Sequence, residues 1–436
     1  MFQTLVNSFK NKGVRNKIFL TLFLLLIYRL GSWLPVPGIS SNVFNAPNDD
    51  GGFLGLLNAI TGGALQNGAF LAIGIAPYIN ASIIIQLLTV AIPPLERLSK
   101  RGEEGRQKIT QLTRYFTLLL AIAQSIGIVI TWSNSDSLDL LIFGAGTSRF
   151  VIGMFVVTLL VGGTAFTMWL GEKITDVGVG NGISLLIFTG IISSAGLAIV
   201  NIFGRIAAGG EDGNFAVFEF VGFALLVISI FLLVVFVDLA VRKVPVQYAK
   251  QIKGRKQVGG QNTHIPIKLN ANGVLPIIFA MSLLTFPQLF MSIFWSSTPF
   301  YNGYMNWMGP NKPLYYTLLS VLIFGFSYFY AAIQFNPEEV ARNIQTYGGF
   351  LQGIRPGKPT AEYLGKISSR LTLFGAFFLT FIAVVPSIVF SIVLQDAQLV
   401  NAFSATGMLI VVSVALEFDK QLESQLMMKH YRGFLK

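Results

Sequence analysis

The sequence predicts an all-helical protein that crosses a membrane ten times, and three observations carry this prediction. The chain has 436 residues, of which 53% are hydrophobic and only 12% are charged. Apolar runs near the roughly 20 residues that cross a bilayer as a helix recur from one end of the chain to the other. Lys and Arg gather in alternate connections between these runs, which indicates the direction of each crossing.

Ten apolar segments have the length of spans. We expect them over residues 18–34, 69–92, 113–132, 150–170, 183–203, 215–241, 274–295, 314–335, 371–394 and 402–416. With the N-terminus inside, Arg29, Arg149, Arg205 and Lys312 lie outside, and the other 27 of the 31 Lys and Arg residues lie inside. Both termini are therefore expected in the cytoplasm. The first run lacks a small-residue cleavage pattern and is interpreted as a span, not as a signal peptide.

The second span, 69–92, is the element around which we expect the other spans to be arranged. Gly74 and Pro77 interrupt it, and its polar side chains are all uncharged. A proline inside a membrane helix frees backbone groups, which are tolerated only against protein or a water-filled cavity. Ile75 and Ile79 lie four residues apart and so share one face of the helix. Lipid and water are both candidates for what that face contacts.

The connection between the first two spans contains a short apolar stretch, 53–60, with glycines on both sides. This stretch is far too short to cross a bilayer. We expect a short helix that folds back into the protein from the outer side, which is a re-entrant segment. An amphipathic helix lying on the membrane surface is the alternative.

Two short motifs recur with an offset of five spans. The sequence from Gly74 to Pro77 in the second span has a counterpart from Gly273 to Pro276 in the seventh. The stretch 181–185 in the fifth span similarly resembles 406–410 in the tenth. An odd offset inserts the two copies in opposite directions, as in many transport folds. The sequence therefore predicts two inverted halves of five spans each, residues 1–206 and 207–436.

Catalytic and metal-binding motifs are absent from the sequence. The chain has no cysteine, and its two histidines lie in separate polar segments. Ionisable residues inside spans usually mark ion routes, but Arg29 and Asp238 lie near span ends, where snorkelling accounts for them. Glu172 and Asp176 are expected in the turn after the fourth span. The glycine-rich stretch 178–182 lacks the lysine of a phosphate loop and is interpreted as a tight turn.

Two cytoplasmic connections are longer than orientation requires. The first, 242–270, has seven basic residues and no acidic one, and the second, 336–370, mixes both signs. One interpretation is orientation charge together with attraction to anionic lipid. The other is a protrusion that docks RNA phosphates or an acidic partner surface.

Isoleucines in four of the spans indicate a pore. They are Ile75 and Ile79 in the second span, Ile183 and Ile187 at the same spacing in the fifth, Ile278 in the seventh and Ile410 in the tenth. Each one alone is typical of a lipid-facing or core residue, but a ring of them would exclude ions by dewetting. The uncharged Asn80, Ser82, Gln86 and Gln124 are expected either to wet a seam between helices or to hold helices together.

Three stretches resemble the signature segments of the SecY family. They are GIAPYINASIIIQLL at 74–88, WLGEKITDVGVGNGISLLIF at 169–188 and THIPIKLNANGVLPIIFA at 263–280. A fourth, GIRPGKPT at 353–360, is similar to the tip of the loop between the family's eighth and ninth spans. The resemblance extends over essentially the whole chain. The family forms the protein-conducting channel of the bacterial plasma membrane, so a channel for unfolded polypeptides is expected.

The resemblance implies a ten-helix clamshell around a central pore, with a lateral gate between the second and seventh spans and a plug over 53–65. The six isoleucines would form the pore ring, with Leu409 or Val411 replacing Ile410 if the register of the tenth span is shifted by one residue. The implied gate residues are Asn80, Gln124 and Phe286. The implied plug residues are Phe53, Leu54, Leu56, Leu57 and Ile60. The implied partner-binding residues of the two long loops are Lys253, Arg255, Lys256 and Arg355.

The resemblance also implies partners. These are the membrane subunits SecE and SecG, the SecA motor ATPase, the ribosome, precursors bearing signal sequences, and membrane lipid. No cofactor and no enzyme activity are expected, so a partner must supply the energy. A secondary transporter for small solutes is the runner-up, but it requires a cavity of charged or convergent polar groups. An intramembrane enzyme requires a catalytic dyad or a metal cluster within the spans. We find neither pattern in the sequence.

Overall fold

The computed structural model describes residues 2–37, 39, 58, 61–134, 149–208, 210–248, 251–253, 256–258, 263–270, 273–294, 298–309, 312–393 and 405–433. Ten long helices in these ranges coincide with the ten predicted spans. They are α2 (Lys12–Gly31), α4 (Ala76–Ala91), α6 (Glu103–Asn134), α7 (Arg149–Val177), α8 (Gly182–Ala208), α9 (Gly210–Leu239), α10 (Leu275–Phe294), α12 (Pro313–Gln334), α14 (Lys358–Val393) and α16 (Ala405–Gly433).

Length and hydropathy alone select fewer of these helices as spans. Five described helices qualify, and a sixth is added if α4 and α5 (Pro93–Ser99), which are bent by 105° relative to each other, are taken together. The described apolar parts of α8 and α10 are only 182–197 and 275–285. In α2 and α16, every 18-residue stretch includes more than two charged side chains. The charged residues at the cytoplasmic end of α2 and in the C-terminal half of α16 account for these two helices, and all four helices overlap predicted spans.

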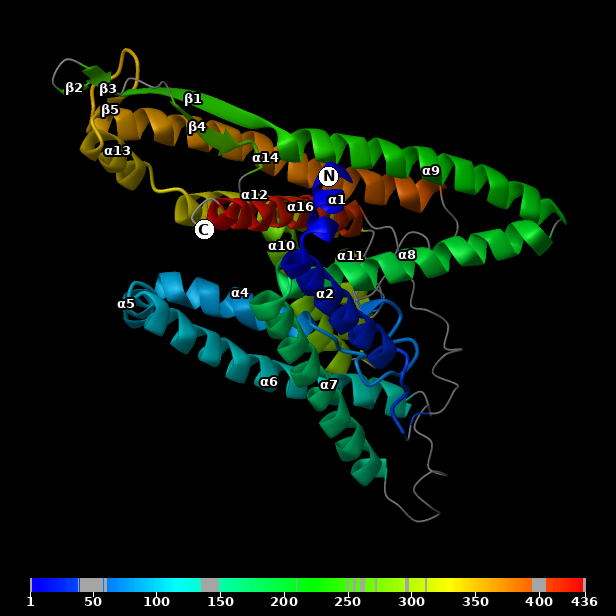
Figure 1. The fold of residues 1–436 in the computed structure, drawn as a ribbon. Helices are drawn as coiled ribbons and strands as arrows, with labels where there is room; N and C mark the ends of the chain where they lie inside the picture. The colour runs from blue at the N-terminus through cyan, green and yellow to red at the C-terminus, as the bar shows by residue number, and fades with distance from the viewer. Residues whose placement is uncertain are drawn as a thin grey trace.

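The helices form a clamshell of two halves (Figure 1). The first half, α2 to α8, runs from blue to green, and the second, α9 to α16, runs from green to red. The halves meet where α10 packs against α4 and α6, and again where α16 packs against α2 and α8. We call the first of these meetings the seam. It is the interface between α4 with α6 on one side and α10 with α12 on the other.

The start of α4 differs from the prediction. We expected a span from residue 69, but residues 62–75 are turns and α4 begins at Ala76. Gly74 has a φ of 58°, which few residues other than glycine adopt, and Pro77 fits the first turn of a helix. The Gly and Pro residues therefore mark the beginning of this helix instead of a break within it. Gly273 repeats the geometry with a φ of 59° just before α10.

The second motif echo is not matched by the same geometry. Asn181 lies before α8, and its Oδ1 accepts a hydrogen bond from the backbone N–H of Ile183 at 3.1 Å. Its counterpart Thr406 already lies inside α16. The stretch 178–181 is the predicted tight turn, but Glu172 and Asp176 belong to the last turns of α7 and not to this turn.

The all-helical prediction did not include two small sheets, which are formed by the first long loop with one edge strand from the second. A three-stranded antiparallel sheet has the order β4 (Thr263–Lys268), β1 (Val241–Tyr248), β5 (Gly349–Phe350), and β2 (Gln251–Lys253) pairs with β3 (Lys256–Val258). Alternate residues of β1, Val244 and Val246, are buried against Ile344 of α13 (Pro337–Thr346). This period of two is typical of a strand with one covered face.

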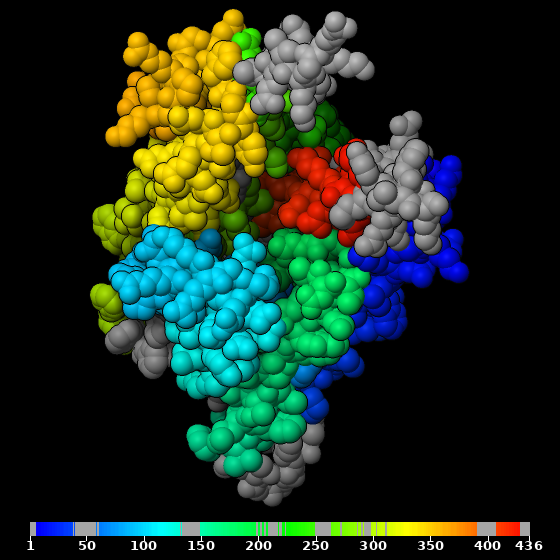
Figure 2. Space-filling model, turned by 60° about the vertical axis from the view of Figure 1, so that its left-hand side comes forward, coloured from blue at the N-terminus to red at the C-terminus, as the bar shows by residue number. Residues whose placement is uncertain are grey.

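The sheets, α5 and α13 lie at one end of the molecule, the left of Figure 1, which we call the loop end. α6 and α14 extend toward it beyond their predicted spans, since they begin at Glu103 and Lys358. Figure 2 brings the loop end forward and shows the cyan residues of the first half facing the yellow residues of the second across a hollow. The remaining short helices are α1 (Phe2–Lys10), which packs on α16, and α11 (Pro299–Met308).

Candidate functional site

All six predicted pore isoleucines lie in one apolar cluster, which we call the isoleucine cluster. Ile75, Ile187 and Ile410 are buried in it, and the other three are half-buried and pack against it. The cluster also contains Leu24 and Tyr28 of α2. The six pore isoleucines come from α4, the residue just before it and α8 in the first half, and from α10 and α16 in the second. Both halves therefore meet in a single apolar contact.

Local backbone geometry places these side chains. After Gly74, the N–H of Ile79 donates to the carbonyl of Ile75 at 3.1 Å, which starts α4 with both side chains on one face. After Gly273, the N–H of Ile278 donates to Val274 at 3.2 Å in the same way. At the start of α8, a Cβ on Gly182 would collide with the carbonyl of Gly171, so only glycine permits this approach to α7.

The structure also places the residues next to Ile410 in the register of α16. Leu409 is fully buried in a separate core of the second half, formed with α9, α10, α12 and α14. Ile410 is buried in the isoleucine cluster, and Val411 is half-buried against it. Of the three, Ile410 is the buried member of the cluster.

The seam has a cluster of its own, continuous with the isoleucine cluster. Ile83 of α4, Phe279 of α10 and Tyr330 of α12 are its buried members. Ile79 and Ile278 belong to both clusters. The Tyr330 hydroxyl donates a hydrogen bond to Oε1 of Gln86 on α4 at 2.8 Å, and we call this contact the seam bond.

Tyr330 is a seam residue that the sequence-based prediction did not name. The sequence analysis named Gln86 as a polar group for a seam but assigned it no partner. A tyrosine within an apolar span was a usable signal, because a buried hydroxyl usually finds a hydrogen-bond partner. The two residues are 244 positions apart, so no local pattern joins them.

The predicted gate residues have different surroundings. Gln124 of α6 is only 2% exposed, and neither its amide nitrogen nor its oxygen has a hydrogen-bond partner in the part of the chain that the structure describes. Asn80 is half-buried on α4, and Ser82 donates to the carbonyl of Ile79 at 2.8 Å. Phe286 lies in α10, and its side chain is outside the described residues. α6 and α10 are in contact, so Gln124 and Phe286 come from helices that meet at the seam.

The predicted plug is described only at its C-terminal end. Phe53, Leu54, Leu56, Leu57 and Ile60 lie outside the described residues. Residues 61–68, which we call the stem, are described, and Thr61, Ala64 and Leu65 in it are buried. Asn58 closes this turn, because its Oδ1 accepts from the N–H of Gln66 at 3.0 Å. The stem itself is therefore folded into the protein, while the predicted short helix over 53–60 lies outside the described residues except for Asn58.

Arg29 does more than snorkel, which corrects the sequence-based interpretation. Its Nη1 donates to the carbonyl of Gly62 at 2.8 Å and to Oγ of Ser32 at 3.1 Å. Its guanidinium also lies 5.1 Å from the centre of the Trp33 ring. We call the bond to Gly62 the stem anchor. Gly62 has a φ of 71°, and a Cβ there would come within 2.8 Å of Arg29 Nη1, so the stem approaches α2 closely.

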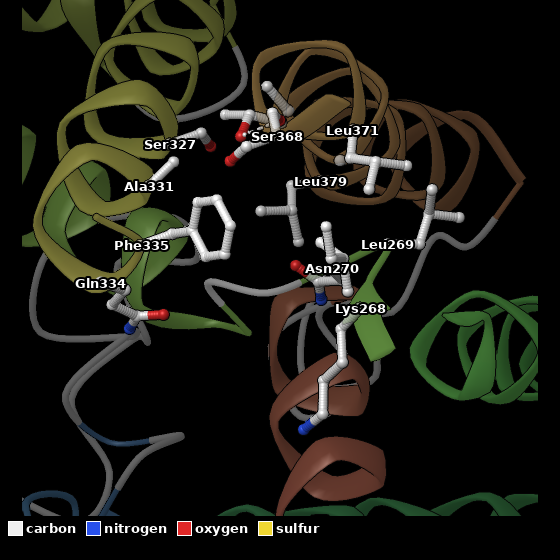
Figure 3. Close-up of a pocket in the computed structure, with 14 residues that line it drawn as sticks. Lys268, Leu269, Asn270, Ser327, Ala331, Gln334, Phe335, Ser368, Leu371 and Leu379 are labelled. Atoms are coloured by element: carbon white, nitrogen blue, oxygen red, sulfur yellow. Dashed lines mark hydrogen bonds between the residues drawn. The ribbon is translucent and has the colours of Figure 1, made fainter. Parts of the chain in front are cut away.

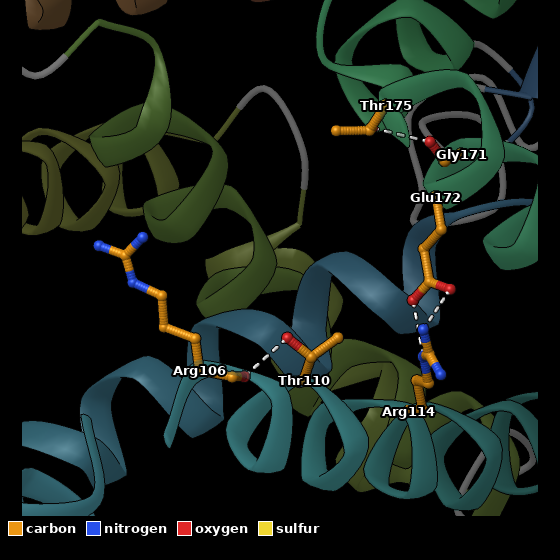
Figure 4. Close-up of polar contacts among 6 residues, drawn as sticks. All are labelled: Arg106, Thr110, Arg114, Gly171, Glu172 and Thr175. Atoms are coloured by element: carbon orange, nitrogen blue, oxygen red, sulfur yellow. Dashed lines mark hydrogen bonds and ion pairs between the residues drawn. The ribbon is translucent and has the colours of Figure 1, made fainter. Parts of the chain in front are cut away.

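An ion pair fixes two helices of the first half (Figure 4). Arg114 of α6 donates from Nε and Nη2 to the two carboxylate oxygens of Glu172 on α7, at 2.8 and 2.7 Å. The two side chains are 46% and 21% exposed, so solvent screens the pair. Its fork geometry sets the position of α6 against α7 more than it adds stability.

The predicted partner-binding residues lie at the loop end. Arg355 is exposed in the turn before α14, and its carbonyl accepts from the hydroxyl of Thr360 at 2.9 Å. Lys253 of β2 is paired in register with Lys256 of β3. Arg255 between them is outside the described residues. The described tips of both long loops therefore lie at the same end of the molecule (Figure 1).

A pocket lies in the second half, between α12, α14 and the chain after β4 (Figure 3). Asn270, Ser327, Gln334 and Ser368 are among its lining residues, but none of the 14 belongs to the isoleucine cluster. Among the described residues, no three His, Cys, Asp or Glu side chains are grouped to hold a metal ion.

The chain is similar to known proteins over its whole length. A family model described as SecY matches residues 69–418. The protein translocase subunit SecY of Halalkalibacterium halodurans is 42% identical over 438 residues, which cover all of both chains. That of Bacillus subtilis is 42% identical over 446 residues, again covering both chains.

Solved structures share the fold. A structure described as that of a protein-conducting channel superposes with a TM-score of 0.67 at 18% identity, covering 94% of this chain and 91% of the other. The match to the family model and the full-length identity to curated relatives lead to one conclusion. The chain belongs to the SecY family.

Proposed function

We propose that this chain is the channel subunit of the Sec translocase. It passes unfolded precursor polypeptides across the plasma membrane and releases transmembrane segments sideways into lipid. One observation carries the proposal, namely that six isoleucines from both halves converge in a single cluster beside the seam. Family membership supports it, since the curated relatives are protein translocase subunits.

The isoleucine cluster acts as an apolar gasket. A constriction lined by branched aliphatic side chains excludes water and ions by dewetting. These side chains have no hydrogen bonds to break, so they part around a polypeptide of any sequence. The same lack of specific bonds explains how one cluster accepts many precursors.

The seam provides the lateral exit. Because Ile79 and Ile278 belong to both clusters, a polypeptide held by the gasket already contacts the seam. When α4 and α10 separate there, an apolar segment gains about 0.8 kcal/mol for each CH₂ that it moves into lipid. Asn80, Gln124 and Phe286 lie on the helices that line this route. Polar segments gain nothing by leaving and continue through the pore.

Partners supply the energy and the remaining subunits. The loop end carries Lys253, Lys256 and the exposed Arg355, and we assign it to contacts with SecA or the ribosome in the cytoplasm. SecE and SecG complete the membrane complex. Both termini lie on the cytoplasmic side of a bacterial plasma membrane in this proposal, which the distribution of Lys and Arg supports.

The test is a disulfide crosslink from the gasket to a stalled precursor. The chain has no cysteine, so Ile278→Cys provides a single thiol. A precursor with its own single cysteine is stalled at successive lengths in membranes that contain the complete translocase. We expect a crosslink that depends on the signal sequence and moves with the stalled position. Absence of a crosslink at every length, with active SecA present, would contradict the proposal.

A matched pair of substitutions tests the gasket itself. Ile278→Asn is expected to increase ion conductance of the resting channel and to admit precursors with defective signal sequences, because an amide wets the constriction. Ile278→Leu keeps an apolar side chain of the same size and is expected to stay close to wild type. Wild-type ion tightness in the Asn variant would exclude Ile278 from the gasket.

A further inference from the structure

Aromatic contacts hold the Tyr330 ring in place, independently of its hydrogen bond. Its ring centre lies 4.8 Å from that of Phe279 on α10 and 5.8 Å from that of Phe329 on α12. Phe326 in turn packs edge-on against Phe279 at 5.9 Å. The side chain is 1% exposed, so these rings leave the hydroxyl one direction, across the seam to α4.

The two partners of the seam bond are unequally placed. Gln86 is exposed and lies five residues before the end of α4, toward the loop end. The protein therefore does not enclose its amide. Tyr330 is enclosed, and an apolar segment that fills the parted seam leaves its hydroxyl without the acceptor that it now uses. Breaking the seam bond therefore costs free energy mainly because the Tyr330 hydroxyl is left buried without a hydrogen-bond partner.

An apolar segment that enters the seam cannot replace this bond. Its aliphatic side chains offer no acceptor to the Tyr330 hydroxyl, so apolar burial has to offset the broken bond. A strongly apolar segment does so, while a weakly apolar one does not. We propose that Tyr330 is a specificity-determining residue whose bond to Gln86 sets how apolar a signal segment must be to open the seam. This inference rests on the proposed function.

One atom separates the test variant from wild type. Tyr330→Phe keeps the ring and its contacts with Phe279 and Phe329 but removes the donor. Tyr328→Phe is the matched control, because Tyr328 lies on the same helix and is exposed. A loss of packing is not expected in either variant, so a difference between them reports on the seam bond.

The first readout needs no precursor. Ile83→Cys places a thiol in the seam cluster, where Ile83 is buried, and the natural chain adds no other cysteine. A water-soluble maleimide reaches this thiol only when the seam opens. Combined with Tyr330→Phe, the labelling rate is expected to rise about threefold to tenfold, as for loss of one neutral hydrogen bond. A thiol from Ile152→Cys, buried in the first half away from the seam, is expected to keep its rate.

The second readout measures selectivity in the complete translocase. Tyr330→Phe is expected to raise export of a precursor with a weakened signal sequence severalfold while leaving a normal precursor unchanged. Gln86→Leu is expected to act like Tyr330→Phe, and the double variant to add nothing further, because one bond is lost only once.

The outcomes separate the inference from the proposed function. If Tyr330→Phe behaves like Tyr328→Phe in both readouts while Ile278→Asn still opens the channel, the seam bond has no gating role and the inference is wrong. If no precursor crosslinks to the pore in any variant, the proposed function is wrong, whatever the thiol rates show. Equal acceleration at Ile83→Cys and Ile152→Cys would indicate general loosening and would also overturn the inference.

Discussion

Two polar contacts lie near the isoleucine cluster. One joins the two halves of the molecule, and the other joins two segments of the first half. The seam bond links α12 of the second half to α4 of the first, through two neutral side chains. The stem anchor links α2 to the stem within the first half, through a guanidinium and a backbone carbonyl. The first crosses the interface that has to open, while the second fixes a segment against its own half.

The chemistry of each contact suits what it joins. A bond between neutral groups contributes about 0.5–1.5 kcal/mol, which an incoming apolar segment readily offsets. A bond from a charged donor contributes about 1.5–3 kcal/mol and is correspondingly harder to break. The contact across the seam is therefore the easier one to break, and the contact that holds the stem against α2 is the harder one. The variants below separate these two roles.

The largest effect is expected when both contacts are removed together. Because the two contacts share no residue and lie on different helices, their free energies should add. Arg29→Met combined with Tyr330→Phe is therefore expected to raise resting ion conductance by the product of the two single effects. Conductance of the purified complex in planar bilayers measures this. A double variant no leakier than the worse single variant would show that both contacts hold one shared element.

Arg29→Met alone is expected to loosen the stem and not the seam. A thiol from Ala64→Cys, at a fully buried stem position, should then react with maleimide on the order of 10 to 100 times faster. The thiol from Ile83→Cys should keep its rate. Arg29→Lys retains the positive charge but not the planar guanidinium, so an intermediate labelling rate of the Ala64→Cys thiol is expected. If the two thiols accelerate equally in Arg29→Met, the distinction between the contacts is wrong.

The smallest effect is expected from Ser32→Ala. The Ser32 hydroxyl accepts a second bond from Arg29 Nη1 and donates to the carbonyl of Arg29 at 2.7 Å, so it orients the guanidinium without touching the stem. Its loss should raise the Ala64→Cys labelling rate only about twofold to fivefold. The same thiol-labelling series measures it. An effect as large as that of Arg29→Met would mean that Ser32, and not the charge, positions the stem.

Hydropathy located the spans well, because a bilayer constrains length and composition within each segment. All ten predicted spans overlap a long helix of the described chain. The same criterion misplaced the start of α4, because residues 69–75 are apolar and buried but form turns. A hydropathy pattern reports burial and is silent on whether buried backbone is helical. Here the positive φ of Gly74 ends the turns and lets the helix begin after it.

The misses share a physical cause, which is contact between residues distant in sequence. β1 and β4 gain their order by pairing, as where Val244 is opposite Ile265, and each strand alone is too short to specify it. The partner of Arg29 lies 33 residues away, so local sequence shows only a cation near a span end. The isoleucine cluster was predictable because the repeated motifs set a common offset. The seam bond has no repeated counterpart to reveal it.

The junction between α9 and β1 has a mechanical consequence. α9 ends at Leu239 and β1 begins at Val241, and the N–H of Leu269 after β4 donates to the carbonyl of Ala240 at 2.9 Å. No slack separates the helix from the sheet, so the two turn as one stiff arm. A load applied at the tip of the arm is therefore transmitted as torque along α9, which packs against α8 of the first half and α16 of the second.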